Sequence, residues 1–307
     1  MKVRNRDGES VAISYDEIKH RILRLWDDGA TDGVDIDTVV IHTVNGIYDG
    51  ITTSELDELS ARVCAGMQAV HFGYDALSAR ILASNAAKNV RRVLLAAGHP
   101  SPTFSAKVAF IDSRLPGVYD ASFVAFVREN AAALDDMLCY ERDALHSYFA
   151  LRTLERSYLM RVDDVCVESA QDMWMRVAIA VSRRASKDAA IGGGMDAVAP
   201  SICEEDTRHE LARIKACYDG MSNGDFTHAT PTLFNAGMCV QQCSSCYLLG
   251  TDDSLAGIFK TISDAAKISK WAGGIGVHVS NVRAKGSRIK STNGVSDGIV
   301  PMLKVSL

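Results

Sequence analysis

The chain has 307 residues, of which 47% are hydrophobic and 23% are charged, and its formal net charge is −5. This size and composition predict a globular protein of two or three domains, while the negative charge excludes capture of a nucleic-acid backbone by a global basic field. Any phosphate binding must therefore be local, which favours a nucleotide over a nucleic-acid partner.

Membrane and metal signals are weak. No run of about 18 apolar residues occurs and the first residues lack a signal-peptide core, so we expect a cytoplasmic protein with no membrane partner. The eight cysteines are expected to be reduced thiols, most of them buried. Cys243 and Cys246 have Cys-x-x-Cys spacing, but structural zinc takes four ligands and no second such pair exists, so we expect no bound metal and assign Cys243 to packing.

The first ninety residues predict a small hairpin followed by four helices. Asp7-Gly8 lies between two short β-prone runs, at 3–5 and 11–13, which is a hairpin signal. Helix caps and apolar residues at helical spacing then predict helices from Ser14 to Trp26, from about 36 to 48, from Thr53 to Val70, and from Asp75 to Arg92.

The next part, from about 93 to 217, is mostly helical in pattern. Residues 140–158 predict one long, partly buried helical region, and 190–202 predict a flexible connection. Trp174 and Met175 are expected in the core.

The most specific stretch runs from Phe226 to Pro301. It contains FTHATPTLFNAG, SSCYLL, DDSLAGIF, KISKWAGGIGV and VRAKGSRIKSTNGVSDGIVP. These blocks predict an extended segment at Thr230, a strand at 244–249, a helix opened by acids, a glycine turn and a basic loop rich in hydroxyl groups. The glycines follow a helix rather than a strand, so they are not a dinucleotide fingerprint.

Each of these features also has an ordinary structural interpretation. Cys246 alone would be read as a buried thiol, and Asp253 and Ser254 as helix caps over an apolar core face. The hydroxyl groups can be satisfied by the backbone, and a basic loop can simply be solvated.

Together, however, the blocks closely resemble the N-terminal portion of the large subunit of class I ribonucleotide reductase, most like that of eukaryotes and large DNA viruses. ALRTLERSYLM at 150–160, ESAQDMWMRVA at 168–178 and VRNRDGESVAISYDEI at the start resemble the same family. The resemblance implies an α/β chain: an ATP cone at 1–92, a helical domain at 93–205, and at 206–307 the start of a ten-stranded α/β barrel with a specificity-effector helix and loop.

For the barrel, the resemblance assigns Cys246 as one of two thiols that become a disulfide while the ribose 2′-hydroxyl leaves as water. This interpretation requires the Cys246 sulfur to face the inside of the barrel. Substrate contacts are implied for Thr230, Ser245, Gly273 and Gly274.

For regulation, the resemblance places a nucleotide effector on Asp253, Ser254, Lys270, Arg283 and Ile289, with the 253–270 helix at a homodimer interface. In the cone it places ATP or dATP on Arg6, Thr53 and Lys88, within a pattern that also includes Val3, Asp7 and Gly8. The family's usual basic residue before Arg-Asp-Gly is Asn5 here, so a binding cone and a purely structural cone both remain open.

The implied function is reduction of ribonucleoside diphosphates to deoxyribonucleotides for DNA synthesis by thiyl-radical chemistry. Its implied partners are a metal-containing small subunit that supplies the radical, the remaining C-terminal part of the large subunit, and thioredoxin or glutaredoxin as reductant. The chain stops before the family's radical-bearing cysteine, so we expect it to be inactive alone, as a split-gene product or a truncation. The alternatives are a nucleotide-binding fragment or regulator and a cobalamin-dependent class II reductase.

Overall fold

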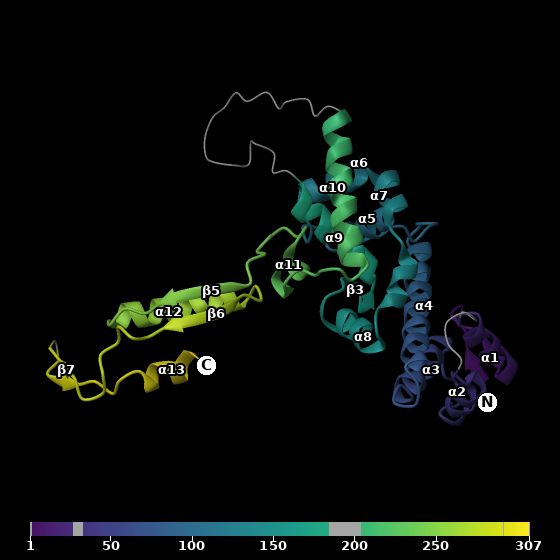
Figure 1. The fold of residues 1–307 in the computed structure, drawn as a ribbon, viewed down its shortest axis with the longest axis horizontal. Helices are drawn as coiled ribbons and strands as arrows, with labels where there is room; N and C mark the ends of the chain where they lie inside the picture. The colour runs from purple at the N-terminus through teal and green to yellow at the C-terminus, as the bar shows by residue number, and fades with distance from the viewer. Residues whose placement is uncertain (1, 27–32, 184–203, 291, 307) are drawn as a thin grey trace. The chain divides into compact units, whose positions relative to one another are not determined.

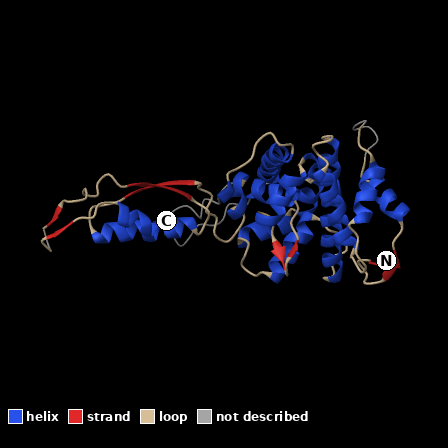
Figure 2. Ribbon diagram, turned by 90° about the horizontal axis from the view of Figure 1, so that it is seen from below, coloured by secondary structure: helices blue, strands red, loops and turns tan. Residues whose placement is uncertain are grey.

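A computed structural model describes residues 2–26, 33–183, 204–290 and 292–306 (Figure 1). The chain divides into a first unit, Met1–Phe226, and a second unit, Thr227–Leu307. The first unit is built mainly of helices (Figure 2). Within the ranges given above, no helix combines the length and the apolar character needed to cross a membrane. The finer division at residues 92 and 205 stays a prediction.

The elements of the first unit are β1 (Lys2–Arg4), β2 (Ser10–Ala12), α1 (Tyr15–Leu23), α2 (Ile36–Asn45), α3 (Thr53–Gly66), α4 (Gly73–Ala96), α5 (Phe104–Arg114), α6 (Ala121–Glu129), α7 (Ala131–Met137), η1 (Tyr140–Leu145), α8 (Tyr148–Ser157), β3 (Arg161–Val162), β4 (Val165–Cys166), α9 (Ala170–Ser182) and α10 (Glu204–Ser222). Those of the second are α11 (Thr230–Asn235), β5 (Cys246–Gly250), α12 (Leu255–Ser269), β6 (Gly274–His278), β7 (Arg288–Ile289), β8 (Gly294–Val295) and α13 (Val300–Ser306).

The predicted hairpin and helices α1 to α4 are present. Strands β1 and β2 pair antiparallel, with Val3 opposite Val11. The predicted caps form as well: the Ser14 hydroxyl accepts a hydrogen bond from the Glu17 backbone N–H at 3.3 Å and starts α1. The apolar faces of these helices share one core that includes Ile22 and Leu77.

Several predicted helix ends were wrong. Helix α3 ends at Gly66, so Val70 lies in a turn and is 76% exposed instead of joining the apolar stripe. Helix α1 ends at Leu23 and α2 at Asn45, both earlier than predicted, whereas α4 begins at Gly73 and continues to Ala96. After α1 and α2 the following turns still contribute Trp26 and Ile47 to the core, which moves the apparent helix boundary, whereas the apolar Val70 after α3 faces solvent.

The middle of the first unit contains a further core around α9. Trp174 and Met175 are buried, as predicted. The single helical region predicted for 140–158 was wrong, because His146 and Ser147 are extended and separate η1 from α8. The Ser147 hydroxyl accepts from the Ala150 N–H at 3.1 Å and starts α8 as a new helix. The connection predicted at 190–202 lies outside the described residues.

Charged side chains are also buried in this core. Arg176 and Glu168 form an ion pair of 2.7 Å between Nε and Oε1, and their side chains are 0% and 2% exposed. Lys107 pairs with Asp172 at 2.6 Å in the same region. Each charge is therefore neutralised where water cannot solvate it.

In the second unit, β5 and β6 pair in parallel and α12 connects them (Figure 1). The strand predicted at 244–249 appears as β5, and the helix predicted after Asp252 appears as α12. Cys246 lies opposite Gly274, and Leu248 lies opposite Gly276. This β-α-β arrangement is the repeating unit of α/β barrels, while closure into a ten-stranded barrel stays a prediction.

Candidate functional site

Cys246 is the first residue of β5 and lies beside a small polar and glycine-lined patch. The Ser245 hydroxyl donates to the Cys246 sulfur at 3.7 Å, and the Gly274 N–H donates to the Ser245 carbonyl at 2.7 Å. Residues alternate between the two faces of a strand, so Cys246 shares a face with Leu248, while Tyr247 points to the face on which α12 packs.

The expectation that the Cys246 sulfur is enclosed was wrong for this structure. Cys246 is exposed and Leu248 is 92% exposed, because no described element packs against their face of the sheet. Cys243 lies before β5 and is partly buried, and this burial raises its pKa. Among residues 2–26, 33–183, 204–290 and 292–306, no group of three or more metal-ligating side chains is positioned to hold a metal ion.

Gly273 and Gly274, both predicted to contact substrate, lack a side chain for different structural reasons. A Cβ at Gly273 would lie 2.6 Å from Ile268 Cγ2 and 2.9 Å from Tyr247 Cε2, so a side chain there would collide with the packing of α12 on β5. A Cβ at Gly274 would lie 3.0 Å from the Ser245 carbonyl oxygen. Gly273 therefore serves helix packing, which the sequence did not reveal, whereas Gly274 leaves bare backbone beside Cys246.

Thr230 is the first residue of α11 and not part of an extended segment, so that prediction was wrong. Pro231 occupies the first turn of this helix, where its fixed φ and missing N–H are tolerated. Thr232 and Asn235, which sequence reasoning missed, donate side-chain hydrogen bonds of 3.1 and 2.8 Å to the carbonyls of residues 243 and 242. Helix α11 thereby holds the segment that leads into β5.

The start of α12 and the basic segment after β6 meet, as the predicted effector residues require. Asp253 Oδ2 pairs with Arg283 Nε at 2.8 Å, and each side chain is about one third exposed. Ser254 caps α12 by accepting from the Gly257 N–H at 3.0 Å. An anion or sugar hydroxyl could therefore reach Asp253, Ser254 and Arg283 together from solvent.

Within a single copy of the chain, the other two predicted effector residues, Lys270 and Ile289, do not lie beside Asp253 and Ser254. Lys270 follows the last residue of the 15-residue helix α12, at the end opposite Ser254, and its ammonium lies 5.3 Å from the centre of the Trp271 ring. Such a helix spans roughly 22 Å, so Lys270 does not join Asp253. Ile289 lies in β7, which pairs with β8 as a hairpin where a loop was predicted.

In the first unit, the predicted cone residues converge on a buried acid. Asp57, whose side chain is 2% exposed, pairs with Arg6 at 3.0 Å and with Lys88 at 3.8 Å, and also contacts Arg21. Arg6 donates to the Thr53 hydroxyl at 3.4 Å. Sequence reasoning missed Asp57, although it stands one helical turn after Thr53 on α3.

This cluster contains three cations and one carboxylate. Burial lowers the pKa of Lys88 and of Arg21, while attraction to Asp57 opposes both shifts. The excess of positive charge favours an anion at this place. Asn5, which stands where the family has a basic residue, instead accepts from the N–H groups of Asp7 and Glu9 at 3.0 and 2.8 Å and stabilises the hairpin turn.

Comparison with known proteins matches these regions to one family. The family model for the all-alpha domain of ribonucleotide reductase matches residues 144–241, and that for its barrel domain matches residues 244–306. The chain is similar to ribonucleoside-diphosphate reductase large subunits or chains: 39% identical to that of Arabidopsis thaliana, 36% to large chain 2 of Saccharomyces cerevisiae and 36% to that of Vaccinia virus.

Each of these alignments covers 99% of this chain but only 34%, 32% and 36% of the respective relative. The chain thus spans about a third of the length of the curated relatives that it matches. A helical all-alpha domain followed by the start of a barrel domain agrees with the observed order of elements. The resemblance seen in the sequence is confirmed, and the chain belongs to the ribonucleotide reductase large-subunit family.

Proposed function

We propose that the protein provides the regulatory part and one wall of the active site of a class I ribonucleoside-diphosphate reductase. The observation that carries this proposal is the similarity to large subunits of that name along 99% of the chain. The reaction would convert ribonucleoside diphosphates to deoxyribonucleoside diphosphates. It would need a metal-containing small subunit as radical source and the remaining barrel strands of a large subunit.

Cys246 would supply one of the two thiols that reduce the ribose. The C2′–O bond breaks and the oxygen leaves as water, while two electrons and two protons come from a pair of thiols that becomes a disulfide. The second thiol would come from the remaining barrel, and thioredoxin or glutaredoxin would restore the pair. The Ser245 hydroxyl next to the sulfur and the bare backbone of Gly274 leave room for a sugar at this place.

Thr230 would contribute its hydroxyl to the substrate diphosphate from the first turn of α11. The hydrogen bonds that tie α11 to residues 242 and 243 support this role, because they fix the helix relative to the segment carrying Ser245 and Cys246.

A deoxynucleoside triphosphate would bind at the start of α12 as specificity effector. Its sugar would contact Asp253 and Ser254, and its phosphates would contact Arg283. Lys270 fits this site only from a second copy. Two α12 helices packed antiparallel would bring Lys270 of one copy toward Asp253 of the other, and the exposed Leu255 and Phe259, at 76% and 60%, would provide the apolar contact.

ATP or dATP would bind at the cluster of Arg6, Thr53 and Lys88. The charge excess around Asp57 supports phosphate binding there, since a phosphate would balance the two surplus cations. The cone would then act as the sensor of the ATP-to-dATP ratio.

Reconstitution tests the catalytic proposal. The chain is mixed with a polypeptide carrying the remainder of a large subunit and with the small subunit, and reduction of a ribonucleoside diphosphate is measured. We expect turnover with the wild type and with Cys243→Ser, and none with Cys246→Ser, because only Cys246 would donate electrons. Absence of turnover, or an active Cys246→Ser variant, would refute the proposal.

A further inference from the structure

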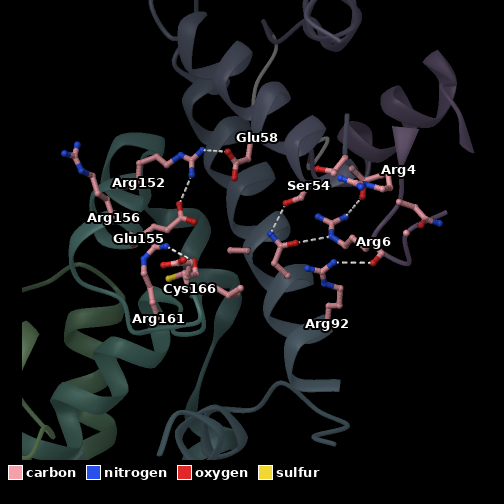
Figure 3. Close-up of a pocket in the computed structure, with 18 residues that line it drawn as sticks. Arg4, Arg6, Ser54, Glu58, Arg92, Arg152, Glu155, Arg156, Arg161 and Cys166 are labelled. Atoms are coloured by element: carbon pink, nitrogen blue, oxygen red, sulfur yellow. Dashed lines mark hydrogen bonds and ion pairs between the residues drawn. The ribbon is translucent and has the colours of Figure 1, made fainter. Parts of the chain in front are cut away.

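A cavity of about 530 Å³ in the first unit lies between α4, the start of α5, η1, α8 and the segment before α9. Its size is within the range of small-molecule sites. The cavity beside Arg6 and Thr53 is lined by several arginines (Figure 3), whereas the described part of the chain contributes no arginine to this one. The two cavities therefore differ in the charge of the ligand that they can accept.

The walls of this cavity are largely apolar. Leu82 and Val90 of α4 and Leu151 of α8 are 4%, 5% and 8% exposed, and Pro102 and Leu159 complete the apolar lining. Three alanines of α4, at positions 83, 86 and 87, contribute small side chains that leave the space open. A ligand with an apolar body would be stabilised here, because its binding removes apolar surface from water.

The charged part of the lining is acidic. It consists of four carboxylates and one ammonium group, which belong to Glu141, Asp143, Glu155, Glu168 and Lys107. An excess of negative charge in a concave surface disfavours phosphates and other anions. The cavity is therefore unsuited to a nucleotide.

Three of these five charges are neutralised by ion pairs: Lys107 with Asp172 at 2.6 Å, Glu168 with Arg176 at 2.7 Å, and Glu155 with Arg152 at 2.8 Å (Figure 3). Glu141 is exposed, so water solvates its charge. Asp143 is 9% exposed and forms no ion pair within the described ranges. It is thus the buried carboxylate of the lining whose charge lacks a paired cation.

Neutral hydrogen bonds hold Asp143 in place. Its Oδ1 accepts from the Gln171 side-chain amide at 3.0 Å. The Gln171 amide oxygen in turn accepts from the hydroxyls of Tyr218 and Ser222, at 2.8 and 2.5 Å, so the amide nitrogen is oriented toward Asp143. Burial raises the pKa of Asp143 to about 6, as expected for a carboxyl group that is desolvated without a paired cation.

We propose that this cavity binds a lipophilic amine, that is, an apolar molecule that carries a protonated amino group. The ammonium pairs with Asp143, and the apolar body lies against α4 and Leu151. A charge-assisted hydrogen bond of this kind supplies the cation that the buried carboxylate lacks. The ligand enters where lining residues are exposed, at Ala87, Ser101 and Glu141. The inference goes beyond the proposed reductase function and does not rest on it, since none of the lining residues belongs to the sites assigned there.

Calorimetric titration of the full chain with three indoles of matched shape tests the proposal. The probes are tryptamine, which is a cation, 3-propylindole, which has a methyl group in place of the amine, and indole-3-propionate, which is an anion. The titrations are done at about pH 7.5, where Asp143 is ionised. We expect tryptamine to bind at least about tenfold more tightly than 3-propylindole, and indole-3-propionate to bind most weakly.

Two variants locate the binding. Asp143→Asn keeps an oxygen for the Gln171 amide and removes the unpaired buried charge, so it should fold, weaken tryptamine binding about tenfold to a hundredfold and leave 3-propylindole binding unchanged. Its matched control is Asp136→Asn, which removes the same charge from an exposed position of α7 outside the lining. Ala87→Phe places a large side chain in the cavity from an exposed position of α4 and should weaken both probes, whereas Ala96→Phe, on the same helix but outside the lining, should weaken neither.

Thermal unfolding of each variant confirms that it is folded before titration. The proposal would be overturned if tryptamine failed to bind, or bound no more tightly than 3-propylindole. Equal weakening by Asp143→Asn and Asp136→Asn would also overturn it, because the effect would then reflect net charge alone. An Ala87→Phe variant that binds both indoles as tightly as the wild type would place the binding outside this cavity.

Discussion

Replacing Glu168 by Gln should severely destabilise the first unit. Glu168 accepts from Arg176 Nε at 2.7 Å, from Arg176 Nη2 at 3.3 Å and from the Met160 N–H at 3.0 Å. The Arg176 side chain is fully buried. A glutamine has nearly the same shape but removes the negative charge that faces the guanidinium group and turns one accepting oxygen into a donor group.

The expected size follows from that geometry. Breaking a buried ion pair by removing one partner costs about 3–5 kcal/mol, and for a unit of this size each kcal/mol lowers the melting temperature by roughly 2–4 °C. We therefore expect the melting temperature to fall by about 6–20 °C. The double variant Arg176→Met/Glu168→Leu should recover most of the loss, because it removes both charges and fills the space with apolar atoms.

Urea and thermal unfolding, followed by circular dichroism, measure the effect. The matched control is Lys19→Gln, which breaks a surface pair with Asp37 of 2.6 Å, as short as the buried pair. That variant should unfold almost as the wild type does, because solvent screens exposed charges. If Glu168→Gln lowered the free energy of unfolding by less than about 1 kcal/mol, the reasoning that burial, and not distance, sets the strength of this ion pair would be refuted.

Three further predictions concern single side chains. Burial raises the pKa of Asp143 to about 6, so its contribution to stability is present below the unfolded pKa and is lost as pH rises through 6. Asp143→Asn should therefore stabilise the fold by on the order of 2–3 kcal/mol at pH 7 and by almost nothing at pH 4, and urea unfolding at both values checks this; equal effects at the two pH values would contradict it. Gly273→Ala should lower stability by about 1–3 kcal/mol in thermal unfolding because of the 2.6 Å contact, whereas Gly250→Ala, which meets no atom within 4 Å, should have little effect. Arg283→Gln should weaken binding of a deoxynucleoside triphosphate about tenfold to a hundredfold at an unchanged melting temperature, and calorimetry showing unchanged affinity would remove Arg283 from the effector site.

Structural features that depend only on residues close together in the sequence, such as helix caps and hairpin turns, were predictable from the sequence. The cap at Ser254 and the helix indicated by the apolar spacing of α12 depend on neighbouring residues, and both form, although no residue of α12 is buried in a core. The same holds for the Asp-Gly turn of the first hairpin. The grouping of Arg6, Thr53 and Lys88 was also found, through family resemblance and not through periodicity.

Features that depend on distant partners were not predictable. Asp57 looks like an ordinary helix residue until the hairpin, α1 and α4 each bring one cation to it. The packing requirement at Gly273 was missed because nothing in the sequence indicates that Ile268 and Tyr247 occupy its side-chain position, while its contact with substrate stays a prediction. The exposure of Cys246 depends on what covers one face of a sheet, and the spacing of residues along a strand carries no information about that cover.

Helix α4 is one continuous element of 24 residues that connects the Asp57 cluster with the core of the first unit. Lys88 contributes to the Asp57 cluster, and the earlier turns of the helix pack in the core around Leu77. An uninterrupted helix of this length measures roughly 36 Å and moves as a rod, so a tilt of about 5° at one end shifts the other by about 3 Å. Any movement of Lys88 that tilts α4 would thus also displace the turns of the helix that lie in the core.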